Sequence, residues 1–294
     1  METPFMTPPT PPPAQSMRQK TVLTFDNLED SDRAKKIRKI VMAVMLPILG
    51  IAVFLGLWEL ITNVFKLSLP GPFKAVKESW QYIAHPFFSN GPNDKGLGWQ
   101  LLASLQRVAI GYSLAALVGV LLGILIGRFA FLHKAVDPIF QLLRTVPPLA
   151  WLPISLAIFN KANPSAIFVI FITALWPILI NTSVGVMRIS DDFENVAKVY
   201  QIRGRRYFFK ILLPASAPFI FTGLRISIGM AWLAIVAAEM LTGGVGIGFF
   251  IWDSWNSSRM SDIVISVVYV GLVGLALDRL VAFAGKYFGA QKES

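Results

Sequence analysis

The sequence predicts an all-α integral membrane protein with six transmembrane helices, and three observations lead to that fold class. Hydrophobic residues make up 54% of the 294 residues and charged residues 15%, and the mean hydropathy is +0.59, as in polytopic helical membrane proteins. Several apolar stretches reach the length of about 20 residues that a helix needs to cross a bilayer. The sequence has no alternating strands of barrel length, so helices are expected to satisfy the backbone hydrogen bonds within the membrane.

Six segments are expected to cross the membrane. They are residues 40–61, 108–127, 136–159, 165–187, 216–241 and 263–284. The third segment is irregular, because prolines stand at positions 138, 147, 148 and 153 and each removes a helical hydrogen bond. Pro147 and Pro148 therefore mark either a hinge in the translocation path or a simple kink. A short amphipathic helix is also expected over residues 72–83, opened by a proline.

The distribution of basic residues predicts that both termini lie inside the cell. With the N-terminus inside, seventeen Lys and Arg fall on the cytoplasmic side, six outside and four within spans or at their edges. The net charge of +10 is then explained by topology and by contact with anionic lipid, with no need for nucleic acid as a partner. We expect a plasma (cell inner) membrane protein with multiple spans.

Four parts are expected along the chain. Residues 1–31 are rich in proline and are predicted to form a disordered cytoplasmic tail. Residues 32–98 hold the first span and an external loop, residues 99–285 the remaining core, and residues 286–294 a cytoplasmic C-terminal tail.

The residues for catalysis, cofactor binding or metal binding are missing from the sequence. Cysteine is absent, and the two histidines, His85 and His133, have no carboxylate at ligand spacing. The run GGVGIG at 243–248 lacks the lysine and Ser/Thr of a phosphate-binding loop. We therefore predict no catalytic, cofactor or metal site, and no ATP site on this chain.

Glycines and charged residues within the spans are the next candidates. Gly119, Gly123 and Gly127 recur every four residues and predict a close packing seam, either within the chain or between two copies. Ionisable residues within spans are functional candidates, although snorkelling or an interfacial position is the better explanation for each of them taken singly. The candidates for the translocation path are Arg225 (first choice for meeting an anion), Arg144 (second), Trp232, Pro147 and Glu239.

The polar stretch from Arg188 to Pro214 lies between two spans and has the order of a helix. Asp191, Asp192 and Glu194 come first and basic residues come last, which suits the helix dipole. The stretch predicts a short helix on the cytoplasmic face, about residues 191–204, with a turn at Gly204.

This stretch resembles the coupling-helix motif of ABC-transporter permease subunits, in outline E-A-A, three residues, G, nine residues, I-x-L-P. Ile211, Leu213 and Pro214 match its end and Ala197 matches its second alanine. Asn195 stands where the glutamate is expected, Val196 replaces the first alanine and Gln201 replaces the glycine. The resemblance implies contact with an ATPase through the residues Asn195, Ala197, Lys198, Gln201, Arg203 and Gly204.

The resemblance spans about residues 99–279 and includes FTGLRI at 221–226 and AWLAIVAAEML at 231–241. These segments are similar to the permease branch serving nitrate, bicarbonate, taurine and aliphatic sulfonates, above all to cyanobacterial nitrate permeases. The resemblance implies a type I importer architecture (MetI-like) and import of a small anion, with nitrate (and nitrite) first and bicarbonate or a sulfonate as alternatives. It also implies a homodimeric pore, two cytoplasmic ATPases that hold ATP and magnesium, and an external substrate-binding protein or lipoprotein.

A secondary transporter driven by an ion gradient is the alternative from another class. It would need coupling-ion carboxylates in mid-span, and internal repeats are common in such proteins. The sequence shows few mid-span acids and no convincing repeat.

Overall fold

The computed structural model describes residues 25–66, 68–91 and 94–288 of the chain. Within these residues the regular elements are all helices, and an isolated bridge between Ser89 and Lys95 is the sole β-type pairing. The chain divides into two compact units, residues 1–67 and residues 68–294, which are described separately. The expected all-helical fold class is confirmed.

The first unit contains one long helix, α1 (Phe25–Val64). Its segment Val41–Val64 is apolar and long enough to cross a membrane, a little longer than the predicted span 40–61. The helix begins at Phe25, so residues 25–31, expected to belong to a disordered tail, are helical. The rest of the predicted tail lies outside the described residues.

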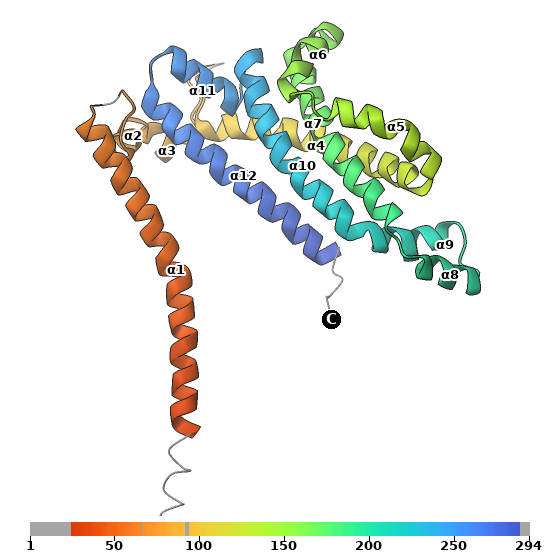
Figure 1. Cartoon of the computed structure of the whole chain (residues 1–294). Coiled ribbons are helices and arrows are strands. Elements are labelled where there is room, and N and C mark those ends of the chain that lie inside the picture. The colour runs from red at the N-terminus through yellow and green to blue at the C-terminus, as the bar shows by residue number, and fades with distance from the viewer. Residues whose placement is uncertain (1–24, 67, 92–93, 289–294) are drawn as a thin grey trace, which may run out of the picture. The chain divides into compact units, whose positions relative to one another are not determined.

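The second unit contains the remaining elements, shown in Figure 1. They are α2 (Pro72–Glu78), α3 (Trp80–Ala84), α4 (Leu97–Arg128), α5 (Ala130–Leu143), the 3₁₀ turn η1 (Pro148–Ala150), α6 (Trp151–Phe159), α7 (Ala162–Met187), α8 (Asp191–Val199), α9 (Arg205–Tyr207), the π-helical turn η2 (Phe208–Leu212), α10 (Leu213–Thr242), α11 (Ile247–Asn256) and α12 (Met260–Phe288). We name the two ends of this unit after the helices that lie near the two ends of α10. Helices α8 and α9 come before α10, at the α8 end, and α11 follows α10, at the α11 end.

Helix α7 is the centre of the core and packs along α4 on one side and α10 on the other. The glycine seam lies on α4 and faces α7. A Cβ on Gly119 would meet Ile178, one on Gly123 would meet Thr182, and one on Gly127 would meet Ser183. The seam is therefore within the chain, where the small residues let the two backbones approach closely.

Five helices can each cross a membrane, and a sixth span requires α5 and the η1–α6 segment to be counted together. These two pieces are bent by 90° at the break between Leu143 and Pro148. The third predicted span, 136–159, is thus a broken helix. Pro148 lacks the amide hydrogen that would bond to Arg144, and the residue before a proline disfavours helical backbone, so the helix ends before this pair.

Two stretches outside the predicted spans contain more helices than expected. The predicted helix at 72–83 is two helices, α2 and α3, joined at Ser79. The glycine-rich stretch after residue 241 contains helix α11. The aromatic residues Phe249, Phe250, Trp252 and Trp255 stand on this helix, and Phe250 is buried.

Candidate functional site

The α8 end carries the stretch that resembles a coupling helix. Ser190 caps α8, because its hydroxyl accepts a hydrogen bond from the amide of Asp192 at 3.2 Å. The helix ends at Val199, and the amide of Ile202 then donates to the carbonyl of Ala197 at 2.8 Å. Local chemistry thus produces a short, well-delimited helix.

The turn after α8 contains two residues with positive φ. Gly204 has φ +54°, which glycine adopts at no steric cost. Gln201 has φ +52°, although it carries a side chain. Gln201 stands where the coupling-helix motif has glycine, the residue that adopts a positive φ at no steric cost.

Helix α8 exposes an apolar stripe, which we name the α8 stripe, and buries one small residue. The stripe repeats at helical spacing and consists of Phe193, Val196, Val199 and Tyr200, with Val199 and Tyr200 exposed by 79% and 74%. Ala197 is 4% exposed and faces the rest of the unit. An apolar stripe on an exposed helix is typical of a protein contact surface.

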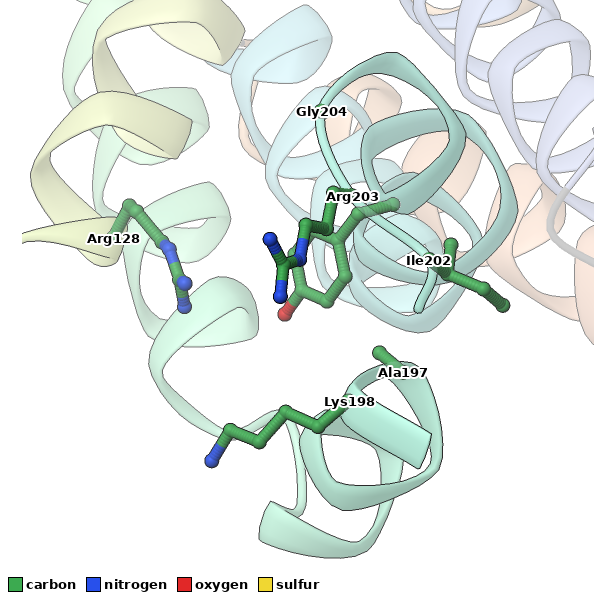
Figure 2. Close-up of a pocket in the computed structure, with 7 residues that line it drawn as sticks. Arg128, Ala197, Lys198, Ile202, Arg203 and Gly204 are labelled. Atoms are coloured by element: carbon green, nitrogen blue, oxygen red, sulfur yellow. The ribbon is translucent and has the colours of Figure 1, made fainter. Parts of the chain in front are cut away.

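A basic pocket of about 290 Å³ lies beside the α8 stripe, and Figure 2 shows its lining. Arg128 at the end of α4 and Arg203 in the turn contribute guanidinium groups, and Lys198 lies on α8. Arg128 also stacks over Tyr207, with the guanidinium carbon 5.4 Å from the ring centroid. The concentration of positive charge favours an acidic partner surface.

The structure brings the six predicted coupling residues together at the α8 end. Asn195, Lys198, Gln201, Arg203 and Gly204 are exposed, and only Ala197 is buried. Arg128 and Tyr207 complete the pocket and were missed by the sequence reasoning, because nothing in the local pattern indicates that the end of α4 returns to this turn.

The α11 end is held by a buried polar network. Three successive amides at the start of α11, those of Gly246, Ile247 and Gly248, donate to side chains from other helices. The acceptors are Gln100 and Ser104 of α4 and Glu239 of α10, at 2.7, 3.0 and 3.0 Å. These bonds satisfy amides that a helix start otherwise leaves without partners.

Arg107 completes this network and links four segments. Its Nη1 donates to Glu239 at 2.6 Å and to the carbonyl of Val245 at 2.8 Å, and its Nε donates to Asn163 of α7 at 2.6 Å. Glu239, a predicted residue of the translocation path, is 1% exposed. Its carboxylate is enclosed by partners and joins α4 to α10 and α11, and its place in the path stays a prediction.

Arg225 and Trp232 also hold helices together in the structure. Arg225 forms a two-pronged ion pair with Asp278 of α12, at 2.7 and 2.9 Å. Trp232 is 3% exposed, and its indole N–H donates to the carbonyl of Val270 at 3.0 Å. Both residues were predicted to line the path. Trp232 fills the contact between α10 and α12, and Arg225 is paired with Asp278, so their part in the path stays a prediction.

Arg144 and Pro147 lie at the break between α5 and η1. Arg144 terminates α5, and its side chain is exposed. It lines a cavity of about 320 Å³ together with residues of α7 and α10. Of the predicted path residues, Arg144 is thus the one that combines a charge with a cavity.

A further cluster near α2 and α12 was missed by the sequence reasoning. Ser79 donates to Asp262 at 2.7 Å, and Arg259 donates to Tyr82 at 3.0 Å and to Asp253 at 2.7 Å. Burial raises the pKa of Tyr82, so its phenol stays protonated at neutral pH. The partners are up to 183 residues apart, so no sequence motif signals them.

The described residues include no group of three or more His, Asp or Glu side chains that is arranged to hold a metal ion.

Comparisons with known proteins agree on one family. Residues 119–290 match the family model "Binding-protein-dependent transport system inner membrane component". The chain is 58% identical over 240 residues to the nitrate import permease protein NrtB of Synechocystis sp., covering 82% of this chain and 87% of the relative. It is 53% identical over 246 residues to the bicarbonate transport system permease protein CmpB of the same organism, covering 83% and 88%.

The fold also has a solved counterpart. A structure of the MetNI methionine ABC transporter in an inward-facing conformation aligns with a TM-score of 0.52 and 18% identity, over 63% of this chain and 94% of that chain. The expected MetI-like architecture is thereby confirmed. The chain belongs to the family of binding-protein-dependent transport system inner membrane components, the permease subunits of ABC importers.

Proposed function

We propose that this chain forms the membrane path of an ATP-driven importer for a small inorganic anion, with nitrate (and nitrite) as the substrate. Support comes from its similarity to nitrate import permeases, which exceeds its similarity to bicarbonate permeases by a few per cent of identity. Bicarbonate is therefore the second candidate, since both relatives align over most of the chain.

The observation that carries the proposal is the exposed α8 stripe beside a basic pocket. A helix of nine residues that exposes Val199 and Tyr200 beside Lys198 and Arg203 is built for a protein partner with apolar and acidic groups. We assign this partner as the cytoplasmic ATPase subunit of the importer. The positive-inside rule supports the same sidedness, because basic residues gather at the α8 end.

The complete importer in this proposal has four further protein subunits in a lipid bilayer. A second copy of this chain closes the pore, two ATPases hold ATP and magnesium, and an external binding protein or lipoprotein delivers the anion to the α11 end. This chain supplies the path and the coupling surface and holds no nucleotide itself.

Substitution of Ala197 tests the coupling surface. Ala197→Glu places a charged side chain into the 4%-exposed position beneath α8 and should displace the helix. We expect the variant to insert into membranes but to lose at least about 90% of binding-protein-stimulated ATP hydrolysis in the reconstituted complex, because a displaced α8 loses contacts of about 1.4 kcal/mol or more. The measurement is ATPase activity in proteoliposomes beside co-purification of the ATPase.

Asn256→Glu is the matched control for co-purification of the ATPase, since it adds the same charge at an exposed position of the α11 end, away from α8. Normal ATPase recruitment and stimulation in Ala197→Glu would remove α8 as the coupling element.

Substrate and driving force are tested together by uptake. Labelled nitrate should enter vesicles only when ATP, the ATPase and the binding protein are present, and unlabelled nitrate should compete better than bicarbonate or taurine. Uptake by the isolated chain under a proton or sodium gradient would instead establish a secondary transporter.

A further inference from the structure

The four arginines within spans or at their edges differ in their partners. Arg107 pairs with Glu239, Arg225 pairs with Asp278, and Arg279 interacts with the charge of Asp278. The side chain of Arg144 forms no ion pair or hydrogen bond with the residues that the structure describes. An ionised group at membrane depth without a counter-charge is unfavourable, so such residues mark ligand or ion paths.

The position of Arg144 follows from the break in the third span. Helix α5 stops at Leu143, and the chain turns through 90° before η1, so the end of α5 opens toward α7 and α10. The resulting cavity of about 320 Å³ is lined by Arg144 and Thr145, by Thr173, Trp176 and Asn181 of α7, and by Met230 of α10. The ring of Trp176 is fixed against α5, with its centroid 5.7 Å from that of Phe140.

The cavity offers hydrogen-bond donors and one positive charge. The hydroxyls of Thr145 and Thr173 donate to carbonyls of their own helices at 2.7 and 2.6 Å, so they have little left to donate. Asn181 uses one amide hydrogen for the carbonyl of Pro177 and keeps the second. The guanidinium of Arg144, the indole N–H of Trp176 and this second hydrogen therefore remain as donors.

No carboxylate is among the residues lining the cavity. A site with these donors suits an anion and disfavours a cation. The planar, forked guanidinium matches two oxygens of a planar oxyanion, a geometry that the ammonium of lysine does not provide.

We infer that Arg144, Trp176 and Asn181 form a binding site for a planar, singly charged oxyanion within the membrane path. The inference deepens the proposed function and rests on it, because the site lies on the membrane path that the proposal assigns to this chain. The site is a step in the path, separate from the external protein that first captures the anion.

The test uses the whole complex, with permease, ATPases and binding protein, in proteoliposomes. In Arg144→Ala, the KM for labelled nitrate should rise about tenfold or more, the loss expected for charge-assisted hydrogen bonds. ATP hydrolysis stimulated by the loaded binding protein should remain, so fewer anions move per ATP. Arg144→Lys should keep the charge, lose the fork and show an intermediate KM.

Arg279→Ala is the matched control, because it removes an arginine from a span but lies outside the cavity lining. Its KM for nitrate should match that of the unaltered complex. If Arg144→Ala fails to insert, the intermediate KM of Arg144→Lys still decides the matter.

An unchanged KM in both Arg144 variants, in a complex that transports nitrate, overturns the site and leaves the proposed function intact. A complex that imports neither nitrate nor bicarbonate overturns the proposed function itself. A second possible occupant of the site is the anionic headgroup of a lipid. Proteoliposomes of phosphatidylcholine, with and without phosphatidylglycerol, distinguish this headgroup from free nitrate. If the Arg144→Ala effect appears only with phosphatidylglycerol, the occupant is a lipid headgroup and the inference fails.

Discussion

The two ends of the second unit are built in opposite ways. At the α11 end, Glu239 is 1% exposed, and its carboxylate accepts hydrogen bonds from Ser104, Arg107 and Gly248. At the α8 end, Ala197 is buried, whereas Val199 and Tyr200 are largely exposed. One end completes its polar contacts within the chain, and the other leaves apolar and basic groups for a partner.

The difference indicates which end keeps its shape without partners. Buried, fully paired polar groups specify one arrangement of helices, because every alternative leaves a charge without its partner. The α8 end has a capped helix and a turn but few contacts of its own. We therefore expect the α11 end to move as a rigid body with α4 and α10, and the α8 end to be ordered further by its partner.

The largest effect is expected from Glu239→Ala. The substitution leaves the partly buried Arg107 without its carboxylate and removes the acceptor of the Gly248 amide. Breaking a buried ion pair from one side destabilises a protein by about 3–5 kcal/mol. Thermal unfolding of the purified chain in detergent should therefore shift to a clearly lower temperature.

Glu239→Gln serves as the control for this first substitution. The amide keeps the shape and one acceptor, so its loss of stability should be smaller than that of the alanine variant. Equal unfolding temperatures for Glu239→Ala and the unaltered chain would show that the α11 end is not held by this network.

A smaller loss of stability is expected from Gly123→Val, in the glycine seam between α4 and α7. The added Cβ would lie 2.6 Å from the Cβ of Thr182 and 2.8 Å from the carbonyl oxygen of Leu179, so α4 and α7 must separate. Overpacking of this kind destabilises by about 1–3 kcal/mol. The same unfolding measurement tests it.

Gly229→Ala is the matched glycine substitution, because a Cβ at Gly229 meets no atom within 4 Å. The unfolding temperature of this variant should stay the same or rise slightly, as alanine favours helix. If both glycine variants behave alike, the seam contributes no close packing.

The smallest effect is expected at the α8 end, from Gln201→Gly. Gln201 has φ +52°, a conformation that costs a residue with a side chain about 1–2 kcal/mol and costs glycine almost nothing. After the greater flexibility of glycine in the unfolded chain is subtracted, the local gain should be about 0.5–1 kcal/mol. Slower hydrogen exchange in the amides of α8 is the readout.

Asn195→Gly lies within α8 itself and has the opposite expectation. Glycine inside a helix is less favourable than asparagine by about 0.3 kcal/mol, so exchange in α8 should become slightly faster. Faster exchange in both variants would show that the turn does not limit the stability of α8.

The sequence predicted those parts of the candidate site that depend on residues close together along the chain. The stretch ending in Ile211, Leu213 and Pro214 resembled a coupling helix, because charge order and motif spacing are both local signals. The pairing of Arg225 with Asp278 joins residues 53 positions apart, and that of Arg107 with Glu239 joins residues 132 apart. Hydropathy patterns record neither distance nor direction between helices, so the sequence did not indicate that Arg225 and Glu239 each have an ion-pair partner.

From the sequence alone we could predict a membrane-spanning chain, the positions of its spans, a glycine seam and a segment that resembles a coupling helix. Each follows from composition, from the length of apolar stretches or from spacing along one helix. Only the tertiary structure decided which charges are neutralised. It enclosed Glu239, paired Arg225 with Asp278, bent the third span and left Arg144 at a cavity without an acid. The physical reason is that electrostatic partners are chosen by proximity in space, which the packing of α4, α7, α10 and α12 establishes.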